Sequence, residues 1–150
     1  MQALFAQRET LLKIAQPLSD VLNLLIRFYL AKVFFMSGLT KLRDWETTVF
    51  LFQEEYRVPL LSPELAAFFG TAGELVLPVL LLLGLAGRLA GLGLFVLNIV
   101  AVVSYYHVLS EVQSMLDAHF YWGLLLAVVV LYGPGRLAVD HWLCRRCQSA

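Results

Sequence analysis

Polar and ionisable residues interrupt the long apolar segments of this 150-residue chain, and their types are suited to chemistry. Arg27, Glu74, Asn98 and Trp122 each stand in a different apolar segment. A charged group inside hydrocarbon is costly, so such positions are functional candidates by default. At a helical rise of about 1.5 Å per residue, all four come out about 14 to 16 Å from one membrane face. The spacing therefore predicts one polar layer near the middle of the membrane.

Two interpretations of this layer are open. In the first, Arg27 and Glu74 neutralise each other, Asn98 completes their hydrogen bonds, and the cluster only specifies how the helices pack. In the second, the layer is a pocket for a small ligand such as a quinone headgroup, because a charged pair can donate to a carbonyl and relay a proton. We predict that Glu74→Gln and Arg27→Leu each impair function, and that a charge swap between the two positions partly restores it.

Two further residues complete the candidate site. Lys41 lies on the same face of its predicted helix as Arg27, at heptad-like spacing. His119 can act as a proton donor, because histidine titrates near neutral pH. His107 and His119, with Glu111 and Asp117 nearby, have ligand types that suit a transition metal, but their spacing matches no established motif and no metal site is predicted. The ligand-binding candidates are Arg27, Glu74, Asn98, Trp122, His119 and Lys41.

A C-x-x-C pair, Cys144 and Cys147, lies near the C-terminus with His141 three residues before it. A single pair of this kind is a weak signal for a redox or metal site. A polar tail is the favoured interpretation, and a redox or metal role is the alternative.

Four apolar segments are long enough to carry these residues across a membrane. A spanning helix needs roughly 20 apolar residues to cross about 30 Å of hydrocarbon. The predicted spans are 18–42, 65–85, 89–106 and 118–133, within one domain of residues 1–150. The fourth is short, so it either begins nearer Val112 or thins the bilayer. We predict an all-α membrane protein, a four-transmembrane-helix bundle joined up and down.

Composition and charge narrow the class of protein further. Hydrophobic residues make up 60% of the chain and charged residues 15%, whereas soluble domains are about half apolar and a quarter charged. The 11 basic residues equal the 11 acidic residues, so the chain lacks the basic excess on which nucleic-acid binding depends. A lipid bilayer is the expected partner, and nucleic acid is not.

The distribution of basic residues predicts the orientation of the bundle. Both termini and the second loop share one side of the membrane. That side holds six basic residues against three on the other: Arg8, Lys13, Arg88, Arg136, Arg145 and Arg146 against Lys41, Arg43 and Arg57. The excess predicts that both termini are cytoplasmic. No small-residue cleavage site follows the first apolar segment, which is interpreted as a retained signal anchor. Asp44 is expected to cap a short surface helix reaching Arg57.

An ordered series of motifs carries a family resemblance over about residues 27 to 140. The series is Arg27, Ser37-Gly38-Leu39-Thr40-Lys41-Leu42, Val58-Pro59, Gly73-Glu74-Leu75, Gly84-Leu85-Ala86-Gly87-Arg88, Gly133-Pro134-Gly135-Arg136 and Asp140. In this series the chain resembles the DoxX family of small four-helix membrane proteins. The family pattern usually has serine before the terminal aspartate, where this chain has Val139, and the cysteine pair lies outside the pattern.

The resemblance implies a membrane partner of a redox system, since the family is named for its similarity to a subunit of a thiosulfate:quinone oxidoreductase. Our leading expectation is an accessory subunit in the cell inner membrane that contacts quinone. The rival is a non-catalytic anchor or assembly factor for a partner enzyme. A small-solute carrier is disfavoured, because broken helices and repeats are absent from the sequence. Whether the chain is an enzyme, and whether it forms a homo-oligomer, stay open.

Overall fold

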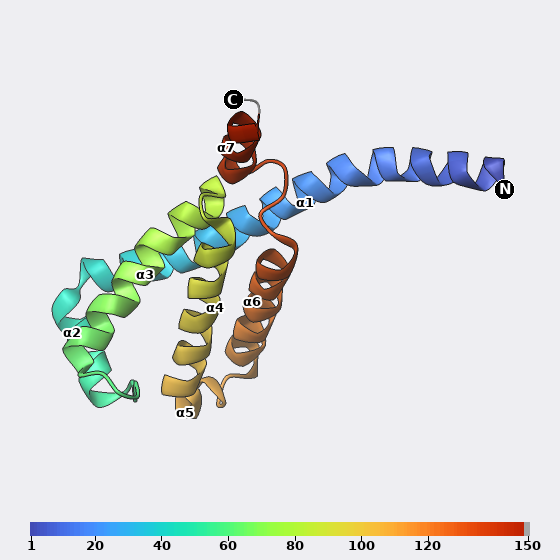
Figure 1. Cartoon of the computed structure of the whole chain (residues 1–150). Helices are drawn as coiled ribbons and strands as arrows, with labels where there is room; N and C mark the ends of the chain where they lie inside the picture. Colours follow the sequence, from blue (N-terminus) through green and yellow to red (C-terminus); the bar gives the residue numbers. More distant parts are fainter. Residues whose placement is uncertain (149–150) are drawn as a thin grey trace.

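The computed structural model describes residues 1–148, with side chains described at residues 1, 13, 15–144 and 146. The described chain consists of helices joined by short loops, without strands (Figure 1). In order, the helices are α1 (Gln2–Arg43), α2 (Trp45–Glu54), α3 (Pro63–Leu83), α4 (Gly87–Ser104), α5 (Tyr106–Leu109), α6 (Gln113–Tyr132) and α7 (Val139–Gln148).

Four helices are long and apolar enough to cross a membrane, which confirms the predicted class of fold. They are the Ala15–Arg43 part of α1 together with α3, α4 and α6. α6 begins at Gln113, so the fourth span is longer than residues 118–133 and needs no local thinning of the bilayer. α1 also begins far earlier than residue 18, and its N-terminal part extends away from the bundle (Figure 1).

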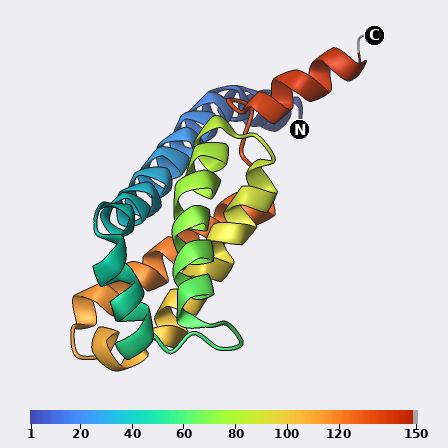
Figure 2. The same ribbon diagram turned by 90° about the vertical axis from the view of Figure 1, so that its left-hand side faces the viewer.

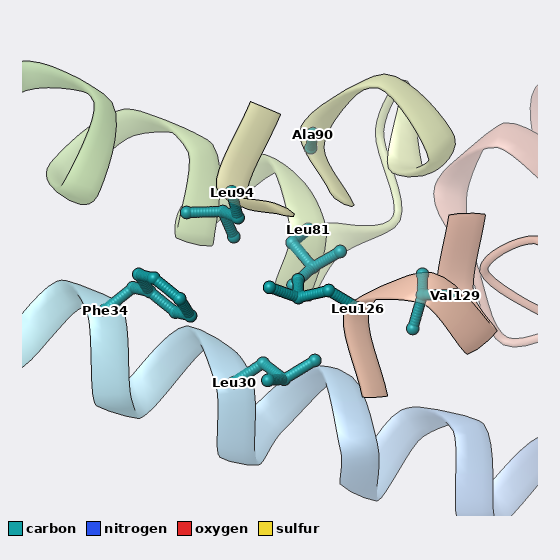
Figure 3. Close-up of a cluster of buried hydrophobic side chains, with 7 residues drawn as sticks. All are labelled: Leu30, Phe34, Leu81, Ala90, Leu94, Leu126 and Val129. Atoms are coloured by element: carbon teal, nitrogen blue, oxygen red, sulfur yellow. The ribbon is translucent and has the colours of Figure 1, made fainter. Parts of the chain in front are cut away.

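The four long helices are packed around one apolar core. α3 contacts α1 and α4 along much of its length, and α6 contacts α4. Every long helix contributes to the core (Figure 3). Its buried side chains are Leu30, Phe34, Leu81, Ala90, Leu94, Leu126 and Val129. Most other large apolar side chains of these helices face outward, as expected where lipid replaces water around a bundle.

The two ends of the bundle differ. The turn between α3 and α4, the segment 133–138 and α7 lie at one end, which we call the terminal end (Figures 1 and 2). α2 and α5 lie at the opposite end, which we call the distal end. This is the up-down arrangement that the spans predict. Which end faces the cytoplasm stays a prediction, and the side chains of Arg8 and Arg145, which entered the charge count, lie outside those described.

The predicted surface helix is α2, and Asp44 caps it as expected. The Asp44 carboxylate accepts hydrogen bonds from the backbone N–H of Thr47 at 3.0 Å and from its hydroxyl at 2.7 Å. These bonds lower the pKa of Asp44. The helix ends at Glu54, short of the expected limit, and the N–H of Arg57 then donates to the carbonyl of Ser104 at 3.0 Å. That bond attaches the segment after α2 to the end of α4.

A tight junction holds the terminal end together. The Asp140 carboxylate at the start of α7 accepts from the N–H groups of Ala86 and Gly87, at 3.0 and 3.1 Å, and so caps the start of α4. The N–H of Asp140 in turn donates to the carbonyl of Gly84 at 3.1 Å. A Cβ on Gly87 would lie 2.7 Å from Pro134 Cβ. The glycines of this turn therefore allow the segment 133–140 to pack directly on the backbone.

Gly84→Ala is expected to lower the free energy of unfolding by about 2 kcal/mol, because a non-glycine residue is strained in this conformation. Gly84 has φ +68°, and a Cβ there would lie 2.5 Å from Ala138 Cβ and 2.8 Å from Nη1 of Arg27. Gly70→Ala on α3 is the matched control, since its Cβ would meet only Phe52, at 3.7 Å. Thermal unfolding in detergent should show a loss for Gly84→Ala alone. Equal melting temperatures would contradict the packing of this turn.

Candidate functional site

The structure contradicts the predicted pairing of Arg27 with Glu74. The side chain of Arg27 is fully buried, and it points to the terminal end. Its Nη1 donates to the carbonyls of Leu82 at 2.8 Å and Leu81 at 3.4 Å, and its Nη2 donates to the carbonyl of Leu137 at 2.8 Å. The last carbonyls of a helix have no partner within that helix and carry its negative dipole end. Arg27 therefore caps α3 and binds the chain after α6.

Glu74 is paired with Lys41 instead. Lys41 Nζ lies 2.6 Å from Glu74 Oε2 and 2.9 Å from Ser37 Oγ, one turn earlier on α1. Both charged side chains are mostly covered, with 19% and 15% of their surface exposed. Gly38 allows α1 and α3 to approach closely enough for this ion pair. A Cβ at this position would lie 3.1 Å from Glu74 Cβ and 2.9 Å from Leu75 Cγ. Two of the predicted ligand-binding residues are thus in contact at one place.

The estimated membrane depths led to the wrong pairing of Arg27 with Glu74 for a geometric reason. The depth estimate counts rise along parallel axes, but α1 runs obliquely across the other three long helices (Figure 1). Arg27 and Lys41 also carry side chains several ångströms long, which extend along hydrocarbon toward polar groups. Arg27 reaches the end of α3, and Lys41 reaches Glu74 near its middle. The residues that were expected in one polar layer therefore form two separate groups.

Asn98 and His119 form a second pair, between α4 and α6. Asn98 Nδ2 donates to the His119 carbonyl at 2.9 Å, and Asn98 Oδ1 lies 2.9 Å from His119 Nδ1. Because the amide NH₂ is used on the carbonyl, its oxygen faces the ring, and Nδ1 is the protonated nitrogen. Nε2 is left to accept a hydrogen bond when the ring is neutral, or to donate one when it is charged. Asn98 thus holds the His119 ring in a fixed orientation, as a proton relay would need.

Trp122 lies beside this pair and does not join the charged groups. Its indole N–H donates to the hydroxyl of Tyr29 on α1 at 3.0 Å. Its ring makes edge contacts with His119, at a centroid distance of 4.9 Å, and with Phe34, at 6.1 Å. Trp122 therefore supports His119 and links α6 to α1.

A cavity of about 270 Å³ at the distal end brings Lys41, Glu74 and His119 to one space. α2 and the segment after it cover α3 there (Figure 2). We call it the distal cavity. Its remaining polar lining comes from Ser37, Tyr56, Ser104 and Tyr105, and its apolar lining from Phe52, Val58, Leu61, Ala66, Phe69, Gly70, Leu97, Val100, Ala101 and Leu109. A partly apolar space with a few converging polar groups is the usual form of a small-ligand site.

Ser104 gives the distal cavity an unused polar group. Its side chain is 2% exposed, and its hydroxyl has no hydrogen-bond partner among the described residues. Leaving a buried hydroxyl unpaired costs about 1 to 3 kcal/mol. A bound molecule or water in the cavity would supply the missing partner.

The tyrosines of this cavity, Tyr56 and Tyr105, were not predicted from the sequence as site residues. The Tyr56 ring is stacked between Phe52, at a centroid distance of 4.6 Å, and Tyr105, at 4.5 Å. Burial raises the pKa of Tyr56, as do the nearby Glu74 and Glu55 carboxylates, so its phenol stays a donor. The sequence signal was weak, because Tyr56 precedes Val58-Pro59 in a loop whose fold over α3 is not encoded locally.

Tyr105 is expected to ionise only near pH 12. Its hydroxyl donates to Glu55 Oε2 at 2.8 Å, and this bond, more than burial, raises the pKa of Tyr105 to about 12. The raised pKa means that the bond stabilises the fold fully below pH 10, the ordinary value, and is lost as pH rises through 12. Difference absorbance near 295 nm, with Tyr105→Phe as the reference, should resolve this ionisation, and Glu55→Gln should lower its midpoint. A midpoint near pH 10 in the wild type would contradict the bond.

Two groups of residues in the sequence have side chains of types that can bind a metal: the group around His107 and His119, and the C-x-x-C pair. The described residues support neither group as a metal site. No three of their histidine, cysteine, aspartate and glutamate side chains gather closely enough to hold a metal ion. The His107 ring packs against Tyr105 at a centroid distance of 5.6 Å. Cys144 is exposed and free, and the Cys147 side chain lies outside those described.

These features define a multi-pass, four-helix membrane protein with a packed junction at one end and a polar cavity at the other. The sequence model of the DoxX family matches residues 22–107, more than half of the chain, so the chain belongs to the DoxX family. The matched residues include Arg27, Lys41, Glu74 and Asn98, but not His119 or the motif from Gly133 to Arg136. Comparison with curated proteins and with solved structures found no match.

Proposed function

We propose that the distal cavity binds the headgroup of a quinone, and that the chain is an accessory membrane subunit of a redox system. The observation that carries this proposal is the Lys41–Glu74 ion pair, which lies against an aromatic-lined cavity within a membrane bundle. An inner-membrane location with both termini in the cytoplasm is part of the same proposal.

The chemistry of the lining suits a flat ring with two carbonyl groups. The Lys41 ammonium, the Tyr56 phenol and the unpaired Ser104 hydroxyl are donors for carbonyl oxygens. Tyr56 and Phe69 offer aromatic surfaces for the ring. Reduction of a quinone to a quinol takes two electrons and two protons. The electrons would come from a partner protein, while Glu74 and His119 are groups of the cavity lining that can exchange protons.

The test is mass spectrometry of the lipid-soluble material that purifies with the protein. Wild type should retain a quinone, and Glu74→Gln should lose at least nine-tenths of it. Glu64→Gln is the matched control, because Glu64 is an exposed carboxylate on the same helix that lies outside the cavity lining and accepts a hydrogen bond from Gln53 at 2.8 Å. No quinone in any of the three preparations would sink the proposal.

The rival function, a non-catalytic anchor or assembly factor, gains support from Arg27. The charge of this buried side chain is directed at backbone carbonyls, which is the structural role that the rival function requires. An anchor would form a stable complex with a soluble enzyme, and Glu74→Gln would leave that complex unchanged.

A further inference from the structure

A groove of about 510 Å³ lies at the terminal end, between α1 and the chain that follows α6. It is separate from the distal cavity, so nothing in the proposed quinone site depends on it. We propose that this groove binds the phosphate of an anionic membrane phospholipid. The residues that carry the argument are Asp20, Arg136, His141, Trp142 and Arg146.

Asp20 holds Arg136 at the edge of this groove. The backbone N–H of Arg136 donates to Asp20 Oδ1 at 3.1 Å, and Arg136 Nε lies 4.0 Å from Asp20 Oδ2. The Arg136 side chain is still 53% exposed, so its guanidinium is accessible to a ligand. Arg146 also lines the groove and adds a second guanidinium to its lining. Guanidinium groups are the preferred partners of phosphate oxygens, because their forked donors match the geometry.

The position of the groove selects a lipid as the source of the phosphate. The first membrane span begins at Ala15 and the fourth ends at Tyr132, so Asp20 and Arg136 lie within about five residues of the span ends. Lipid headgroups occupy the layer just outside the hydrocarbon. Trp142 and Leu143 on α7 are 69% and 50% exposed, as expected of a helix lying in that layer. Basic pockets beside membrane helices are known to hold anionic headgroups.

The test is native mass spectrometry of the full-length protein in detergent, titrated with phosphatidylglycerol or phosphatidylcholine. Wild type should retain phosphatidylglycerol preferentially. Arg136→Gln should weaken that binding about fivefold, and Arg136→Gln combined with Arg146→Gln about 25-fold. Arg88→Gln is the matched control, because it removes one charge from an exposed arginine at the same end but outside the groove. Arg136→Lys keeps the charge and should retain most of the binding, which separates a binding defect from misfolding.

Three outcomes would overturn the proposal. Equal losses in Arg88→Gln and Arg136→Gln would mean general attraction of anionic lipid to a basic end. Unchanged binding in the double variant would place the lipid elsewhere. Displacement of phosphatidylglycerol by millimolar inorganic phosphate would mean that the groove takes a free anion and not a lipid.

Discussion

Arg27→Leu is expected to lower the free energy of unfolding by about 3 kcal/mol, because hydrogen bonds from a charged donor contribute about 1.5 to 3 kcal/mol each. Arg27 makes two such bonds at 2.8 Å, to the carbonyls of Leu82 and Leu137, within a fully buried setting. Leucine fills the space but leaves these carbonyls without a donor. The loss should appear as a lower melting temperature in detergent and as reduced recovery of folded protein.

Arg27→Lys is the informative companion variant. Lysine retains the positive charge but cannot reach the carbonyls of Leu82 and Leu137 together, since it lacks the forked donors of arginine. Its stability should lie between those of wild type and Arg27→Leu. If Arg27→Leu were as stable as wild type, the interpretation of Arg27 as the cap of α3 would be wrong.

Exchanging the charges of Lys41 and Glu74 should restore much of what either single change removes. Breaking a fully buried ion pair costs about 3 to 5 kcal/mol, and this pair is partly exposed, so we expect Lys41→Glu and Glu74→Lys each to cost about 2 kcal/mol. Each single change places two like charges side by side. The double variant re-forms the pair and should recover at least half of that loss, measured by unfolding in detergent.

The same exchange between Arg27 and Glu74, which the sequence alone favours, should give no recovery. Arg27 donates to carbonyls at the terminal end, so a carboxylate at position 27 would face acceptors and meet no cation from Glu74→Arg. Recovery by the Arg27 exchange, together with none by the Lys41 exchange, would contradict the arrangement of these side chains.

The spans and their order could be predicted from the sequence because each follows from a local property. Length and apolar content identify the four long helices, and the Asp44 cap of α2 needs only neighbouring residues. The start of α1 could not be found in this way, since hydropathy marks where a helix enters the membrane and not where the helix begins. α1 runs on to Gln2.

The side-chain partners could not be predicted, because they depend on how obliquely α1 crosses α3. Lys41, Glu74 and His119 were named from the sequence as site residues. Arg27, however, was assigned to Glu74, and Lys41 was left without a partner. Gly38 was the available signal. A glycine three residues before Lys41 indicates a close helix crossing, and the structure shows α3 packed against it at Glu74 and Leu75.

The motifs behind the family resemblance have a physical meaning that spacing alone did not reveal. Asp140 lies far from Gly84 and Gly87 in the sequence but meets them in the junction at the terminal end, where Arg27 also contacts the chain. Gly38 and Glu74 meet at the Lys41 pair. One group of motifs therefore builds the fold, and the other builds the distal cavity.

We propose that a quinone binds in the distal cavity and not in the surroundings of Arg27. The direct measurement is photo-crosslinking of the purified protein with an azidoquinone, followed by peptide mass spectrometry. We predict labelling of residues 52–58 and 69–74, abolished by excess unlabelled quinone and by Glu74→Gln but not by Glu64→Gln. Competable labelling confined to residues near Arg27 and Leu137, with none at the distal cavity, would contradict quinone binding in the distal cavity.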